Sequence, residues 1–269
     1  MNLPHQSAEE VVVRLPRRAW NALKISAVLI AIGGSTVLID SAFAIHAEKE
    51  VGAAIKEVSG LESTPGVYVG GFPYLAAGFL AEHEIPLIEI RALDIEVEQF
   101  GLINAFTKLR DVNVTREQVL SGNFNGAEVS TLSHSIILDG VALGKLFGIT
   151  DLQIANPKNI SPSGGVSTEA ELTGTLPGDE EPTTTVVDLR LVNENFIMTP
   201  VTAPSAKAAE IFSFEMDTRQ LPLPHQASMV RLLGGSLEFE TQTRDTIFDI
   251  HRLSPVEIDG DFDELGNRK

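Results

Sequence analysis

The feature that most constrains this chain is an uncharged apolar run near its N-terminus. Residues 25–39 (ISAVLIAIGGSTVLI) contain no charged side chain. The basic residues that precede the run are Arg14, Arg17, Arg18 and Lys24. A helix needs about 20 apolar residues to cross a bilayer, so we expect the membrane segment to extend to Ile45. Because the basic residues lie on the N-terminal side, we expect that end in the cytoplasm and the rest on the extracytoplasmic side.

Two interpretations of this segment stay open. Ala42-Phe43-Ala44 matches the small-residue cleavage site of a signal peptide. An uncleaved anchor would instead continue as a helix into the residues that follow. The predicted organisation is a basic cytoplasmic N-terminus (1–24), a transmembrane anchor or signal peptide (25–45), one domain (46–253) and a disordered acidic tail (254–269).

Charge and cysteine content exclude several classes of protein. The residues after Ala44 include 16 basic and 34 acidic side chains, a net charge of −18. This charge repels phosphodiester backbones, so we expect no nucleic-acid partner. Adhesion to anionic lipid is disfavoured too, so lipid contact should be hydrophobic or local. The chain has no cysteine, which excludes disulfide-stapled modules and thiolate metal sites and favours a bacterial envelope protein.

Apolar spacing predicts one long helix followed by strands. Ala47, Val51, Ile55 and Val58 recur at helical spacing, and Gly60 ends that pattern. Later runs alternate apolar and polar residues with a period of two, and they cover residues 88–97, 187–191, 212–216 and 237–240. A phase change near residue 92 predicts a β-bulge. Strands with one apolar face are typical of an antiparallel sheet, so we predict an α+β fold.

Short helices closed by glycine are predicted between strands. Thr115 begins a capping box whose helix ends at Gly122, and Asp139 caps a helix that ends at Gly148. A third helix is predicted over residues 227–233, before Gly234-Gly235. Asn125-Gly126 predicts a two-residue β-hairpin turn.

Residue patterns for catalysis are missing from the sequence. The six histidines are scattered, without the spacing of a zinc site, and no nucleophile, phosphate-binding or dinucleotide-binding motif occurs. We interpret His134, within a strand-like run, as structural. Asp94, Glu96 and Glu98 alternate with apolar residues and are interpreted as a solvated strand face. We therefore expect neither an enzyme, a metal site nor a cofactor.

One segment, residues 64–80 (TPGVYVGGFPYLAAGFL), concentrates apolar and aromatic surface. Gly70, Gly71 and Pro73 are candidates for a tight backbone turn. The candidate lipid-binding side chains around them are Val67, Tyr68, Phe72, Tyr74, Leu75, Phe79 and Leu80. Two interpretations remain open: a tightly packed hairpin, or the wall of an apolar ligand cavity.

The order of these features resembles a known family. Residues 65–75 (PGVYVGGFPYL), 112–122 (VNVTREQVLSG) and 143–148 (LGKLFG) are similar to landmarks of the LmeA-like phospholipid-binding proteins of actinobacterial envelopes. The resemblance covers roughly residues 25–250. It implies a tubular lipid-binding-like fold, in which an elongated, curved antiparallel sheet wraps a long amphipathic helix. We expect acyl chains to be buried on the apolar concave face of that sheet.

The resemblance also implies a function. It indicates a non-enzymatic phospholipid-binding protein on the periplasmic side of the cell membrane, with residues 46–253 as the lipid-binding domain. Such a protein would support mannan elongation of lipoglycans (lipomannan and lipoarabinomannan), with a membrane mannosyltransferase as a candidate partner. The alternative is an extracytoplasmic scaffold that stabilises a membrane glycosyltransferase without binding lipid in a cavity.

Overall fold

The structure is a computed structural model that describes residues 17–79, 83–158 and 163–256. The chain divides into two compact units, residues 1–42 and residues 43–269. Helix α1 (Arg17–Ser59) begins in the first unit and ends in the second. Residues 40–46, which lie between the uncharged apolar run and the amphipathic pattern that starts at Ala47, are also helical. The apolar segment and the amphipathic segment are therefore one continuous helix.

The part of α1 in the first unit has the composition of a membrane span. The helical stretch Leu23–Ser59 contains an 18-residue window of mean hydropathy 2.0, so it is long and apolar enough to cross a membrane. Its large apolar side chains include Ile30 and Leu38, which are 74% and 72% exposed. This unit therefore presents apolar surface that water would not favour.

The second unit contains the remaining helices and all the strands that the structure describes. The helices after α1 are α2 (Ala76–Phe79), α3 (Arg116–Ser121), α4 (Gly140–Phe147) and α5 (Ala206–Ile211), with 3-10 turns η1 (Thr218–Gln220) and η2 (Ile250–Arg252). The strands are β1 (Gly66–Val69), β2 (Glu84–Val97), β3 (Gly101–Asn113), β4 (Glu128–Asp139), β5 (Gln153–Ala155), β6 (Ser163–Gly165), β7 (Ser167–Thr175), β8 (Pro182–Val192), β9 (Asn195–Thr202), β10 (Phe214–Asp217), β11 (Met229–Leu233) and β12 (Ser236–Ile247).

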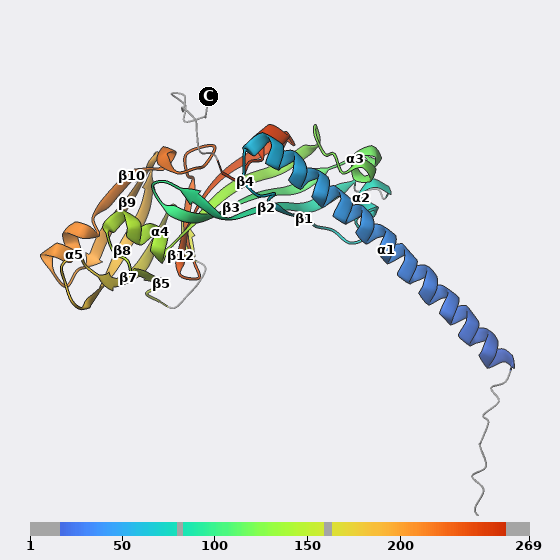
Figure 1. Ribbon diagram of the computed structural model, residues 1–269, viewed down its shortest axis with the longest axis horizontal. Helices are drawn as coiled ribbons and strands as arrows, with labels where there is room; N and C mark the ends of the chain where they lie inside the picture. Colours follow the sequence, from blue (N-terminus) through green and yellow to red (C-terminus); the bar gives the residue numbers. More distant parts are fainter. Residues whose placement is uncertain (1–16, 80–82, 159–162, 257–269) are drawn as a thin grey trace, which may run out of the picture. The chain divides into compact units, whose positions relative to one another are not determined.

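The strands form two antiparallel sheets (Figure 1). Sheet A has seven strands in the order β1-β2-β3-β4-β12-β11-β6, and sheet B has five in the order β10-β9-β8-β7-β5. Strand β12 pairs along its length with β4, from Ser236 opposite Asp139 to Ile247 opposite Glu128. The predicted α+β class with an N-terminal membrane-capable helix is confirmed, whereas the second sheet was not predicted.

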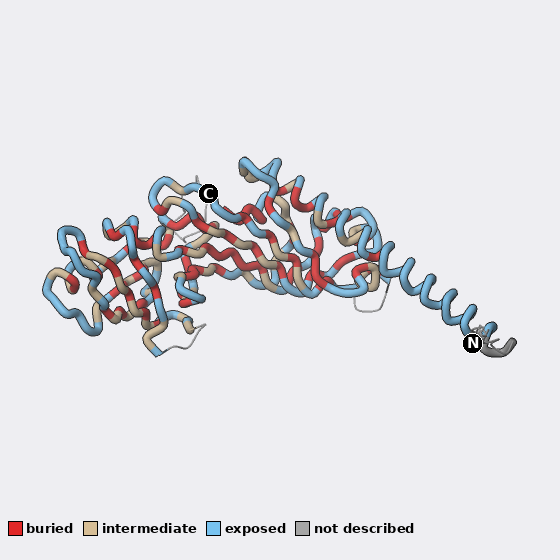
Figure 2. Tube along the Cα trace, turned by 60° about the horizontal axis from the view of Figure 1, so that its bottom comes forward, coloured by how far each residue is buried: buried red, intermediate tan, exposed pale blue. Residues whose placement is uncertain are grey.

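One face of sheet A, here called the inner face, carries both hydrophobic cores. Along β3, Ile103, Ala105, Thr107 and Leu109 are buried and alternate with more exposed residues. Figure 2 shows buried (red) stretches alternating with more exposed ones along the strands. The end of this face near Leu109 packs against α1 residues from Phe43 onward. The other end, near Ile103, packs against sheet B and α4. Protein side chains therefore cover both ends of the inner face.

Capping predictions agree closely with the structure. The side chain of Thr115 accepts from the backbone N–H of Gln118 in a capping box, and the helix ends at Gly122 with φ +74°. Asp139 caps α4, which ends at Gly148 with φ +68°.

The register of β2 against β3 shifts between Ala92 and Ile95. The predicted bulge is confirmed at that position.

Two local predictions were wrong. Residues 229–233, predicted as helical, form strand β11, and Leu233 pairs with Ser236 across a turn at Gly234-Gly235. Both glycines have positive φ, which suits a two-residue hairpin rather than a helix stop. Asn125-Gly126 does form a turn, but it connects α3 to β4 and does not join two paired strands.

The C-terminal segment that the structure describes is packed. Leu253, Ser254 and Val256 are at most 6% exposed. Most of the predicted acidic tail, residues 257–269, lies outside the described residues.

Candidate functional site

The predicted apolar segment is divided between core and surface. Tyr74 is 1% exposed, and its hydroxyl donates to the carbonyl of Val119 at 2.8 Å. Val67 and Leu75 are partly buried against the core beneath α1. These three side chains hold the segment onto the body, as a packed hairpin requires. Leu80 lies outside the described residues.

Three aromatic side chains of this segment face solvent. Tyr68 is 50% exposed, Phe72 is 74% exposed and Phe79 is 49% exposed. None of them belongs to the lining of the apolar hollow described below. The Arg116 guanidinium lies over the Phe79 ring, 4.5 Å from its centroid.

The glycine and proline positions of the segment form its turn. The backbone N–H of Gly70 donates to the carbonyl of Leu87 at 2.7 Å. Gly71 has φ +103°, and the peptide bond from Phe72 to Pro73 is cis. A Cβ added at Gly71 would lie 3.2 Å from Cδ of Pro86. The segment therefore turns closely against the start of β2.

An apolar hollow lies on the outer face of sheet A, opposite the inner face. It has a volume of about 500 Å³ and lies between the β2–β3 connection, β4 and α4. Its apolar lining comprises Phe100, Leu102, Ile137, Val141 and Ile149. Leu102 and Val141 are 60% and 71% exposed, whereas Phe100 and Ile149 belong to the core with sheet B. The hollow therefore leads from solvent to the edge of a hydrophobic core.

The chemistry of this hollow suits an amphiphile. Lys145 is the single basic residue among its twelve lining residues, and its Nζ donates to the carbonyl of Glu98 at 2.7 Å. An ammonium has three donors, so Lys145 keeps capacity for an anionic group. Asp94 and Asp139 lie on the same rim, and Asp139 also caps α4. Size and lining match those of small-molecule sites, which place few polar groups around an apolar wall.

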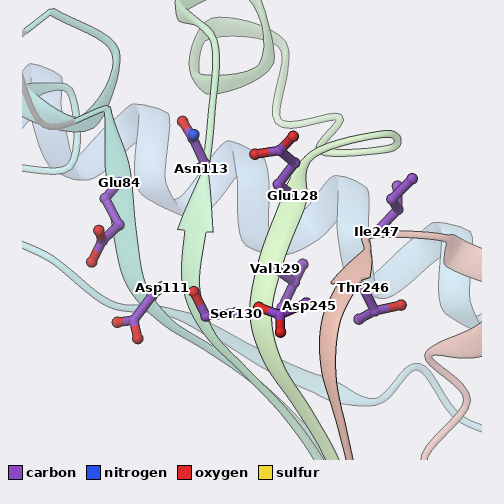
Figure 3. A pocket seen from close by; sticks show the side chains of 9 residues that line it. All are labelled: Glu84, Asp111, Asn113, Glu128, Val129, Ser130, Asp245, Thr246 and Ile247. Carbon is purple, nitrogen blue, oxygen red and sulfur yellow. The ribbon is translucent and has the colours of Figure 1, made fainter.

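A second hollow differs sharply in charge. It has a volume of about 430 Å³ and is lined by the carboxylates of Glu84, Asp111, Glu128 and Asp245, among nine residues of which none is basic (Figure 3). Four carboxylates repel a phosphate group, so this hollow does not suit a phospholipid head group. Within the described part of the chain, no group of three or more His, Asp or Glu is placed to hold a metal ion.

A buried polar row separates the two cores on the inner face. Thr107 and Thr241 pair with His134 from the two neighbouring strands, and all three residues are at most 5% exposed. The Nε2 of His134 lies 3.0 Å from the carbonyl of Arg252. Burial lowers the pKa of His134 to about 4, so its imidazole is neutral at pH 7. This contact holds the C-terminal segment against the sheet.

The fold and the hollow define a class: an α+β protein with a membrane-capable N-terminal helix and an apolar site of ligand size in its larger unit. The chain belongs to the LmeA-like phospholipid-binding family, whose model matches residues 39–242. No curated protein and no solved structure matches the chain. The resemblance inferred from the segment around Gly70-Gly71 is confirmed, and the chain is assigned to a lipid-binding family.

Sequence patterns did not reveal the apolar hollow. Its lining comes from residues 94–104, 137–150 and 236, which only the folded sheet brings together. The available signal was Val141, an apolar residue in the first turn of a capped helix, where solvent-facing positions are usually polar. Residue 102 gives a similar signal, because a leucine occupies the solvent face of β3.

Proposed function

We propose that this chain is a non-enzymatic phospholipid-binding protein of an actinobacterial cell envelope. Helix α1 would anchor it in the cell membrane, with the N-terminus in the cytoplasm and the body on the periplasmic side. It would support elongation of lipoglycan mannan chains, with a membrane mannosyltransferase as partner. Membership of a phospholipid-binding family and the basic residues before the apolar helix support this proposal.

The observation that carries lipid binding is the apolar hollow beside α4. An acyl chain in contact with Leu102, Val141 and Phe100 would be removed from water, at about 0.8 kcal/mol per methylene. Lys145 at the rim would pair with the phosphate of the head group. We expected the acyl chains on the apolar concave face of the sheet. The apolar inner face of sheet A is less favourable for them, because α1 and sheet B already cover it.

Lipid mass spectrometry on full-length protein purified from its native membrane tests this proposal. We compare wild type with Val141→Asp and with a matched control, Val166→Asp. Val141 and Val166 are 71% and 68% exposed, but only Val141 lines the hollow. Wild type and V166D should retain bound phospholipid. V141D should retain about tenfold less, because burying a carboxylate against an apolar acyl chain is unfavourable. Equal lipid content in V141D and V166D would exclude this hollow, and no lipid in wild type would refute lipid binding.

A second candidate function is the scaffold that stabilises a membrane glycosyltransferase. Side chains below 5% exposure, including Ile55, Ile90 and Leu109, fill the space between α1 and sheet A. A filled inner face favours a protein that acts through its surface. In a strain lacking the chain, V141D that restores full mannan length without bound lipid would support the scaffold. Restoration by V166D alone would support lipid binding.

A further inference from the structure

Two exposed phenylalanines lie on a well-supported end of the second unit. We define the α2–α3 tip as residues 70–79 and 115–122. The Tyr74 hydroxyl fixes α2 to α3 through Val119, and a Cβ added at Gly78 would lie 3.1 Å from Cβ of Val119. Phe72 and Phe79 nevertheless stay 74% and 49% exposed. A packed element, and not a loose loop, therefore holds these two side chains at the surface.

The length of the connecting chain limits how far this tip can lie from the apolar run. A Cβ added at Gly122 would lie 2.7 Å from Cα of Ala47, so α1 runs directly against the tip. Ala47 follows Ile39, the last residue of the apolar run, by eight positions. Eight residues span about 12 Å as a helix and at most about 29 Å when extended. The chain therefore keeps Ala47, and the tip that contacts it, within about 29 Å of the end of the apolar run.

The side chains of the tip suit a phospholipid surface. The body is strongly acidic, so contact with anionic lipid must come from apolar insertion or from a local cation. Phe72 and Phe79 supply the apolar surface, and aromatic residues favour the interface between head groups and acyl chains. Arg116 lies over the Phe79 ring and is suited to bidentate pairing with a lipid phosphate. Glu117, the next residue on α3, carries a negative charge that would oppose contact with anionic lipid.

We infer that the α2–α3 tip is a membrane-contacting surface, in which Phe72 and Phe79 insert into the bilayer that holds α1 and Arg116 pairs with a phosphate. The occupant is a phospholipid bilayer and not a single lipid in a cavity. This inference rests on the membrane anchoring in the proposed function, but not on the apolar hollow. Insertion of the tip would fix the orientation of the second unit, and of its other surfaces, relative to the membrane.

Site-specific labelling tests the inference on the full chain. Because the chain has no cysteine, Phe72→Cys, Phe79→Cys and the control Val166→Cys each provide one labelling site for an environment-sensitive fluorophore. Each variant is reconstituted in phosphatidylcholine vesicles, with or without phosphatidylglycerol, after its unfolding midpoint in urea is compared with wild type. Probes at 72 and 79 should shift to the blue and be quenched about threefold more than at 166 by a quencher in the lipid.

Probes at 72 and 79 that stay as water-exposed as at 166 would overturn the inference. Protection that appears only in native membranes, and not in pure lipid, would also overturn it, because it would indicate a protein partner. An Arg116→Gln variant should weaken quenching in both lipid mixtures, since both carry phosphate. The V141D variant separates the two proposals: loss of co-purified lipid with unchanged quenching would leave the tip as membrane contact independent of the hollow.

Discussion

Replacing Gly122 with alanine tests the contact that holds α1 on the body. Gly122 has φ +74°, a backbone region that costs alanine about 1 kcal/mol. An added Cβ would also lie 2.7 Å from Cα of Ala47, so the backbone of α1 must move. Overpacking of this kind costs about 1–3 kcal/mol. We therefore expect G122A to lower the free energy of unfolding by about 2–4 kcal/mol, as the sum of both effects.

Gly126 is a matched control for this experiment. It has φ +84°, but nothing lies within 4 Å of an added Cβ, so Gly126→Ala should lose only about 1 kcal/mol. Both variants are unfolded in urea as full chains in a nonionic detergent, and circular dichroism follows the transition. Equal losses for G122A and G126A would refute the close approach of α1 to α3. A larger loss in G122A with an unchanged urea dependence would support it.

Two further predictions concern pH and processing. Burial lowers the pKa of His134 to about 4, so the unfolded chain binds the proton first when the pH falls from 7 to 4. The free energy of unfolding should therefore fall by up to about 3 kcal/mol over this range. In urea unfolding, the His134→Gln variant should show a smaller pH dependence than wild type, and an equal pH dependence would contradict this prediction. We also expect the native protein to keep Phe43 and Ala44, because both pack against the core beneath α1. Peptide mapping that finds an N-terminus at Ile45 would contradict an uncleaved anchor.

Local signals predicted the elements whose hydrogen bonds are local. The capping box at Thr115 and the cap at Asp139 satisfy backbone donors within the next three residues, so the sequence alone specifies them. Residues 229–233 were misread because Leu232-Leu233-Gly234-Gly235 fits both a helix end and a hairpin turn. The pairing of Val230 with Phe239 stabilises the strand conformation of these residues. That contact depends on tertiary structure.

Site prediction was limited for the same reason. The sequence marked the aromatic residues of segment 64–80 as candidates for lipid binding. Which of them are buried and which face solvent depends on the residues that cover each one. Tyr74 is buried because its hydroxyl reaches Val119, which is 45 residues away in the sequence. Phe72 has similar local surroundings in the sequence and faces solvent. Apolar composition alone could not distinguish the two.

The pairing of β12 with β4 has a consequence for how the chain is made. Residues 140–235, which include all of sheet B, separate these neighbouring strands in the sequence. As the chain is synthesised, the edge of β4 exposes unpaired backbone groups until β12 follows. Exposed edges of this kind recruit other strands and promote aggregation. Synthesis of β12 is therefore the step that completes sheet A. Truncations before residue 236 should be cleared by proteases or chaperones rather than persist as a smaller folded protein.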